Sequence, residues 1–173
     1  MTSLVKQVIG VWQGADGSIA EMIYDGSPLD AMTLFEKVES LPDPARKISA
    51  YLLLENEERS VLPFIGIAYM LPDRTGVVAI FEPGQYVKED GTDHFPQPNN
   101  AAIFNADGSL RFQLKLDWKG GRIEAFHGGA MPRSYKDHLG VVIATHPDAP
   151  PEWVYAIDPN KPELISTGQW VRW

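Results

Sequence analysis

The chain has 173 residues, of which 44% are apolar and 22% charged, and it contains no cysteine. These values are typical of one soluble globular domain spanning residues 1–173, and they exclude disulfides, thiolate catalysis and zinc-thiolate sites. The net charge of −8 disfavours nucleic acid and anionic membranes as partners. The N-terminus lacks a secretory pattern, and no apolar run reaches the roughly 18 residues of a membrane helix, so a cytoplasmic protein is expected.

The first 60 residues predict a hairpin followed by two helices. The hairpin turns at GADGS in VIGVWQGADGSIAEMIY. In SPLDAMTLFEKVES, Ser27 and Pro28 are a cap and a first helical residue, and the apolar residues behind them follow a helical stripe. In DPARKISAYLLLENEE, Asp43 and Pro44 repeat this signal, which predicts a second helix ending near Glu58. The letters SAYLLL could instead begin a strand.

From residue 61 to residue 173 the chain is a succession of β runs with short separators. GVVAIF and GVVIATH are apolar on both sides, so they are expected at central positions of a sheet. The separators suit antiparallel neighbours and are too short for parallel crossovers. The predicted fold is therefore α+β: a twisted antiparallel meander sheet of about six to eight strands, with the two N-terminal helices packed on one face.

The stretch IFNADGSLRFQL raises the question of whether its aspartate is a working group or a turn residue. Asp-Gly between alternating runs is a strong hairpin signal, because both residues tolerate the positive φ that a type I′ turn needs. A calcium loop that starts at Asn105 would place Leu116 where a bidentate glutamate belongs. Asp107 is therefore predicted to be the corner of a hairpin.

Catalytic patterns are not found in the sequence. It has no HExxH, no GxSxG and no phosphate-binding glycine loop, so no catalytic residue, metal or cofactor is expected. One alternative is a small hydrolase, because His127 and His146 end predicted strands and could meet Glu124 or Asp148. Whether the two histidines converge decides that alternative.

The stretch EPGQYVKEDGTDHFPQPNN, residues 82–100, is the best binding candidate. It is long for a sheet connection, and such loops are often functional. It contains four acids and only one lysine, and aromatic residues are interleaved with the acids. This composition favours pairing with arginine and lysine of a partner. The predicted contact surface includes acids of the two helical segments, and its named residues are Glu82, Tyr86, Glu89, Asp90, Asp93 and Phe95.

Tryptophans offer a second alternative. Trp153, Trp170 and Trp173 lie in the last two predicted strands, and strand parity turns at least one of them away from the core. An exposed tryptophan is a common anchor for a partner. A sheet protein that holds a small ligand is favoured if Trp153 and Trp170 line a cavity.

A compact, acidic, cysteine-free chain with hairpins such as FNADGSLRFQLK resembles the small bacterial immunity proteins of contact-dependent inhibition and other polymorphic toxin systems. The resemblance implies a cytoplasmic protein without catalytic activity that binds a cognate toxin domain. Such a toxin is often a basic nuclease, and the immunity protein blocks its active site or substrate surface. The acidic field suits that partner by steering it electrostatically.

Overall fold

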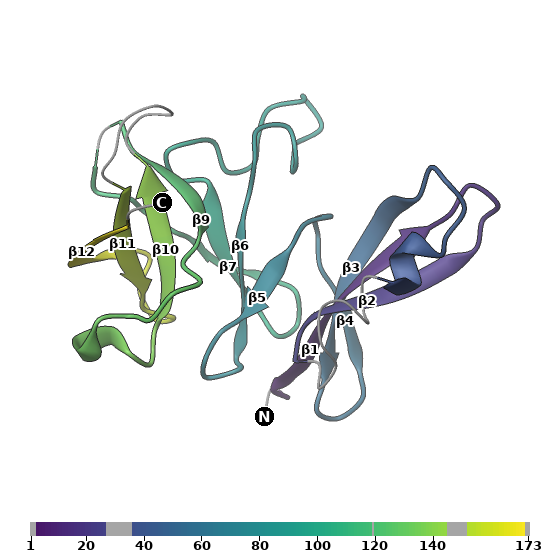
Figure 1. Ribbon diagram of the computed structural model, residues 1–173, viewed down its shortest axis with the longest axis horizontal. Coiled ribbons are helices and arrows are strands. Elements are labelled where there is room, and N and C mark those ends of the chain that lie inside the picture. Colours follow the sequence, from purple (N-terminus) through teal and green to yellow (C-terminus); the bar gives the residue numbers. More distant parts are fainter. Residues whose placement is uncertain (1–2, 27–35, 119, 145–151, 172–173) are drawn as a thin grey trace. The chain divides into compact units, whose positions relative to one another are not determined.

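The computed structural model describes residues 3–26, 36–118, 120–144 and 152–171 (Figure 1). Within these ranges the chain is almost entirely β-structure, with a helical turn at residues 36–39 and a 3-10 turn, η1 (Arg133–Tyr135). The strands are β1 (Val5–Gln13), β2 (Ile19–Asp25), β3 (Arg46–Leu54), β4 (Arg59–Val61), β5 (Ala68–Met70), β6 (Gly76–Ile80), β7 (Ala101–Asn105), β8 (Leu110–Gln113), β9 (Arg122–Phe126), β10 (Leu139–Ala144), β11 (Glu152–Ile157) and β12 (Ile165–Val171). No helix in the described ranges has the length and apolar character needed to cross a membrane.

The strands form three four-stranded sheets, with orders β2-β1-β3-β4, β5-β6-β7-β8 and β12-β11-β10-β9. Several pairs between chain neighbours are antiparallel, as in β1 with β2 and β10 with β11. The expected N-terminal hairpin is confirmed. The apolar strands β6 and β10 each lie between two neighbours, so their predicted central positions are confirmed as well.

The chain divides into two compact units. The first unit contains residues 1–79 and 104–110, and the second contains residues 80–103 and 111–173. In the first unit Val8 and Leu52 are fully buried, and the rings of Phe64 and Phe104 lie 4.9 Å apart. In the second unit Ile143 is fully buried on the central strand β10. Each unit thus has its own apolar core.

The predicted α+β fold is wrong. The segment expected to be the second helix is strand β3 and the turn that follows it. In β3, Tyr51 pairs with Ile9 of β1 and with Val61 of β4, so strand partners satisfy the backbone on both sides. Of the first predicted helix, residues 27–35 lie outside the described residues, and the described helical turn covers residues 36–39. Three four-stranded sheets replace the single sheet of six to eight strands.

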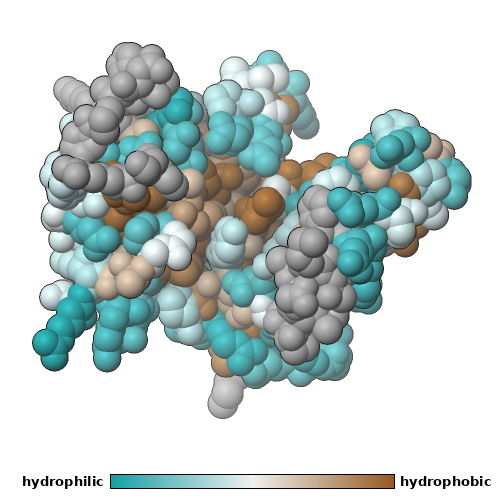
Figure 2. Space-filling view, in the orientation of Figure 1, coloured by the Kyte–Doolittle hydropathy of each residue, from teal (hydrophilic) through white to brown (hydrophobic). Residues whose placement is uncertain are grey.

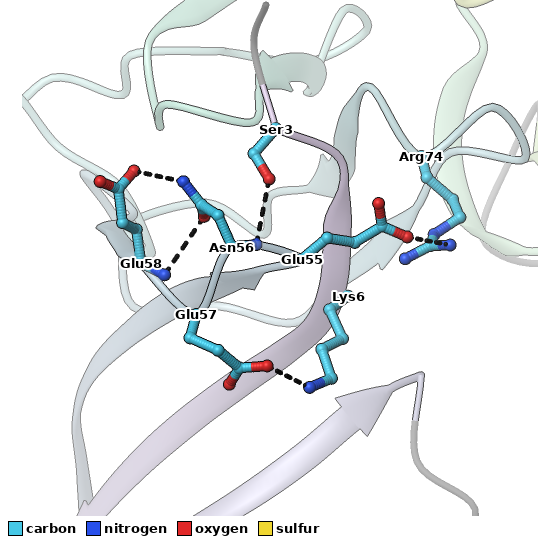
Figure 3. Close-up of polar contacts among 7 residues, drawn as sticks. All are labelled: Ser3, Lys6, Glu55, Asn56, Glu57, Glu58 and Arg74. Atoms are coloured by element: carbon cyan, nitrogen blue, oxygen red, sulfur yellow. Dashed lines mark hydrogen bonds and ion pairs between the residues drawn. The ribbon is translucent and has the colours of Figure 1, made fainter.

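Ion pairs and hydrogen bonds hold the turn between β3 and β4 against neighbouring elements of the first unit (Figure 3). Lys6 of β1 lies 2.6 Å from Glu57, and Arg74 lies 2.9 Å from Glu55. The side chain of Asn56 donates to Glu58 at 2.8 Å. Two acids that were expected on a helix as partner contacts are therefore paired within the protein.

Lys47 of β3 is a half-buried lysine that pairs across the sheet with Trp12. Its Nζ lies 4.2 Å from the centre of the Tyr24 ring and donates a hydrogen bond to the carbonyl oxygen of Gly66. Burial lowers the pKa of Lys47 to about 8. The unfolded chain, in which a lysine has a pKa of about 10.4, therefore binds more protons than the folded protein above pH 8.

We expect the free energy of unfolding to rise by about 1 kcal/mol between pH 8 and pH 9.5 because of Lys47, after allowance for solvent screening of a partly exposed amine. Urea denaturation at the two pH values measures this rise. Lys47→Met should remove it, whereas Lys6→Met, at an exposed lysine, should keep it. An unchanged rise in Lys47→Met would contradict the assignment. The pH range stops below pH 10 because of Tyr51. Burial and the hydrogen bond with Glu21 raise the pKa of Tyr51 in the folded protein to about 12. Above pH 10 the tyrosine therefore ionises in the unfolded chain first, and the free energy of unfolding falls.

Candidate protein-binding site

Residues 82–95 form an ordered turn, which we call the acidic hairpin. They follow β6 in the chain and belong to the second unit. Val87 and Asp93 make an antiparallel bridge. The Lys88 amide donates to the Thr92 carbonyl at 2.8 Å, and the His94 amide donates to the Tyr86 carbonyl at 2.9 Å. The hairpin can therefore present its side chains in a fixed arrangement, which reduces the entropy that a partner would have to remove on binding.

Two of the predicted contact acids shape this hairpin. Asp90 Oδ1 accepts hydrogen bonds from the Thr92 amide at 2.9 Å and from the Thr92 hydroxyl at 2.6 Å. These bonds, the hydroxyl first, lower the pKa of the fully exposed Asp90. Asp93 Oδ1 accepts from the Gly84 amide at 2.8 Å. Both acids therefore fix the backbone of the hairpin.

The aromatic residues of the hairpin form its base. Phe95 is only 8% exposed, and its ring lies 5.3 Å from that of Phe81. Tyr86 lies 5.4 Å from Phe81 and stacks on His94 at 4.1 Å. Burial raises the pKa of Tyr86. Two aromatic residues were predicted to contact a partner. Phe95 is buried and packs inside the protein, whereas Tyr86 is partly exposed.

Glu82 and Glu89 are the exposed carboxylates without a turn-forming role. Neither forms an ion pair with a residue that the structure describes. Figure 2 shows mainly hydrophilic surface over this hairpin, the loop above β6 in Figure 1. The Arg122 guanidinium donates a hydrogen bond to Glu124, and this bond raises the pKa of Arg122. The negative charges of Glu82 and Glu152 raise the pKa of Arg122 further. Both carboxylates are exposed and can pair with cations of a partner, Glu82 beside the charge of Arg122.

Only two of the four residues of the hydrolase alternative lie in the described part of the chain. Glu124 is paired with Arg122, and His127 follows β9. His146 and Asp148 lie outside the described residues. Among the residues that are described, no three His, Cys, Asp or Glu side chains are grouped so that they could hold a metal ion.

The two tryptophans of the ligand-binding alternative lie side by side in the structure. Trp153 of β11 pairs directly with Trp170 of β12, and Trp170 is 45% exposed, so the expected outward-facing tryptophan is confirmed. Trp173 lies outside the described residues. An open hollow of about 290 Å³ lies in the first unit, and its lining contains no tryptophan: Gln13, Gly14, Ala15, Gly17, Pro44 and Arg46.

Sequence reasoning found the acidic hairpin by its length and charge, but it missed which acids are structural. The missed signal is Asp-x-Thr, in which the carboxylate accepts from the backbone and side chain two residues later. Comparison with known proteins adds no assignment: no family model, no curated protein and no solved structure matches this chain.

Proposed function

We propose that this protein is a non-catalytic binding protein whose acidic hairpin contacts a basic surface of a partner protein. The observation that carries the proposal is an ordered hairpin whose exposed Glu82 and Glu89 carboxylates form no ion pair with any residue that the structure describes. The net charge of −8 adds a long-range field of the same sign. Such a field accelerates encounter with a basic partner, and close charge pairs then slow its dissociation.

The partner that this proposal names is a cognate, basic toxin domain, and the protein would act as its immunity protein in the cytoplasm. The resemblance in composition and hairpin style supports this form of the proposal. The hairpin would cover part of the toxin's substrate surface, where its carboxylates stand in for the charges of an anionic substrate. The buried aromatic base would keep these carboxylates in place during binding.

The first experiment is affinity copurification of the tagged protein from its native host at moderate and at high salt, with mass spectrometry of the bound material. A stoichiometric basic toxin fragment that is lost more readily at high salt would support the proposal, because salt screens exposed charges. Recovery of the protein alone, while toxin genes are expressed, would count against it.

Reversing the charge of Glu82 and Glu89 to lysine together is expected to weaken binding of that partner at least tenfold, mainly through slower association. The matched control is Asp117→Lys with Glu163→Lys, which changes the net charge equally at two other exposed acids of the second unit. Asp90 and Asp93 are left intact because they shape the hairpin. Surface plasmon resonance at two salt concentrations measures both rates. Equal losses in the two double variants would show that net charge, and not the hairpin, governs binding.

A further inference from the structure

The carboxyl group of Asp25, at the end of β2, lies against the main chain of the residue that follows it. The Gly26 amide donates to Asp25 Oδ1 at 2.8 Å. From β5, the Met70 amide donates to the other carboxylate oxygen, Oδ2, at 2.9 Å. Both oxygens are therefore held in place, one of them by the nitrogen of the next residue. Asp25 is half-buried and Gly26 is exposed, so water reaches the pair.

The Gly26 nitrogen is the atom that can react with this carboxyl group. It attacks Cγ of the protonated carboxyl group, an N–Cγ bond forms, and the carboxyl OH leaves as water together with the amide proton. The product is a five-membered succinimide ring. Water then opens the ring, and addition at the main-chain carbonyl leaves isoaspartate, in which the chain runs through Cβ and Cγ. Glycine favours the attack because it has no side chain to shield its nitrogen, and a nitrogen held beside the carboxyl group needs no search for it.

The chain contains three further Asp-Gly pairs: Asp16-Gly17, Asp90-Gly91 and Asp107-Gly108. The φ angles of the four glycines lie between +80° and +85°, so the conformation of the glycine is alike in every pair. The pairs differ in what holds the carboxyl group of the aspartate.

In the other three pairs, the carboxyl group is held by the residue two positions later. Oδ1 of each aspartate accepts from both the amide and the hydroxyl of that residue: Asp16 with Ser18, Asp90 with Thr92, and Asp107 with Ser109. The hydroxyl bond first, and the amide bond after it, lower the pKa of all three carboxyl groups. A lowered pKa leaves less of the neutral acid, which is the form that loses water. These bonds therefore protect the three pairs.

We propose that Asp25-Gly26 is the isomerisation site of the folded protein, at which isoaspartate forms in preference to the three other Asp-Gly pairs. In the product, Cγ of Asp25 has become the main-chain carbonyl carbon bonded to the Gly26 nitrogen. The carboxylate that accepts from Met70 is then lost from that position, and with it the hydrogen bond that ties β2 to β5. The modified chain presents an isoaspartyl group, which is the substrate class of protein isoaspartyl methyltransferases.

The test is prolonged incubation of the whole, folded protein in mildly acidic water labelled with heavy oxygen, followed by digestion and mass spectrometry that separates isoaspartyl from aspartyl peptides. We expect isoaspartate at position 25 to accumulate at least about fivefold faster than at positions 16, 90 and 107, with one heavy oxygen atom in each product. The control is the same chain in urea, because unfolding releases every carboxyl group. There the four rates should agree within about twofold.

Ser18→Ala tests the protection at a second pair, since it removes the hydroxyl that holds Asp16 in an exposed turn. Isoaspartate should then form at least about twofold faster at Asp16 and at an unchanged rate at Asp25. The proposal would be overturned by a folded protein without isoaspartate at position 25 or with equal or faster formation at another pair. Persistence of the Asp25 preference in urea, or an unchanged rate at Asp16 in Ser18→Ala, would overturn it as well.

Discussion

Replacing Asn100 with leucine is expected to lower the free energy of unfolding of the second unit by about 3 kcal/mol. Asn100 immediately precedes β7 and is only 1% exposed. Its Nδ2 donates to the carbonyl oxygens of Phe81 and Ile123 at 3.0 and 2.9 Å, and its Oδ1 accepts from the Ile123 amide at 3.1 Å. A leucine of similar size would leave all three backbone groups buried without a partner.

A second substitution separates the hydrogen bonds from the packing. Asn100→Asp keeps the size and the acceptor for the Ile123 amide, but it aims a carboxylate oxygen at two carbonyl oxygens. It should therefore also destabilise the unit strongly, as expected for a buried charge without a cation. The control is Asn160→Leu, in the exposed turn between β11 and β12, for which a change within about 0.5 kcal/mol is expected.

Urea denaturation followed by tryptophan fluorescence measures these changes. The three partner groups of Asn100 all belong to the second unit. If the two units unfold in separate transitions, the loss should appear in the transition of the second unit alone. A loss below about 1 kcal/mol for Asn100→Leu would mean that water or other groups satisfy Phe81 and Ile123 in its absence.

The hairpins could be predicted because short-range chemistry determines them. The pattern Asp-x-Ser or Asp-x-Thr lies entirely within the described residues in four places, and in each one the carboxylate accepts from the amide and the hydroxyl two residues later: Asp16 with Ser18, Asp73 with Thr75, Asp90 with Thr92, and Asp107 with Ser109. The expectation that Asp107 is a hairpin corner is confirmed. Such bonds need no distant residue.

The second helix could not be excluded from local signals. Asp43 and Pro44 resemble a helix start, and the acids that follow Leu54 resemble a helix end. The strand forms instead because β1 and β4 pair with both edges of β3. Pairing with neighbouring strands overrides weak intrinsic preferences. The sequence of β3 itself does not indicate which strands will pair with it.

The acidic segment could be singled out from the sequence, but the structural roles of its residues could not. Charge and length located the acidic hairpin, whereas the burial of Phe95 depends on its packing against Phe81, which lies fourteen positions earlier in the chain. The contact of Met131 with His127 over Gly140 gave no sequence signal, because it depends on the pairing of β9 with β10.

Replacing Gly108 with alanine is expected to lower the free energy of unfolding of the first unit by about 3 kcal/mol, whereas Gly17→Ala should lower it by only about 1 kcal/mol. Both glycines occupy the third position of the tetrapeptide ADGS. Their φ angles are +81° and +85°, a region that alanine adopts only with strain. The intrinsic cost of alanine is therefore nearly the same at both positions.

The difference comes from a distant strand. A Cβ atom on Gly108 would lie 2.5 Å from the carbonyl oxygen of Val61 in β4, whereas a Cβ atom on Gly17 would meet nothing within 4 Å. Both residues belong to the first unit, so the two variants can be compared in one unfolding transition. Urea midpoints with unchanged slopes would give the two losses directly. Equal losses would mean that β4 moves away at little cost, and a larger loss for Gly108 would measure how firmly β4 holds its place beside the turn.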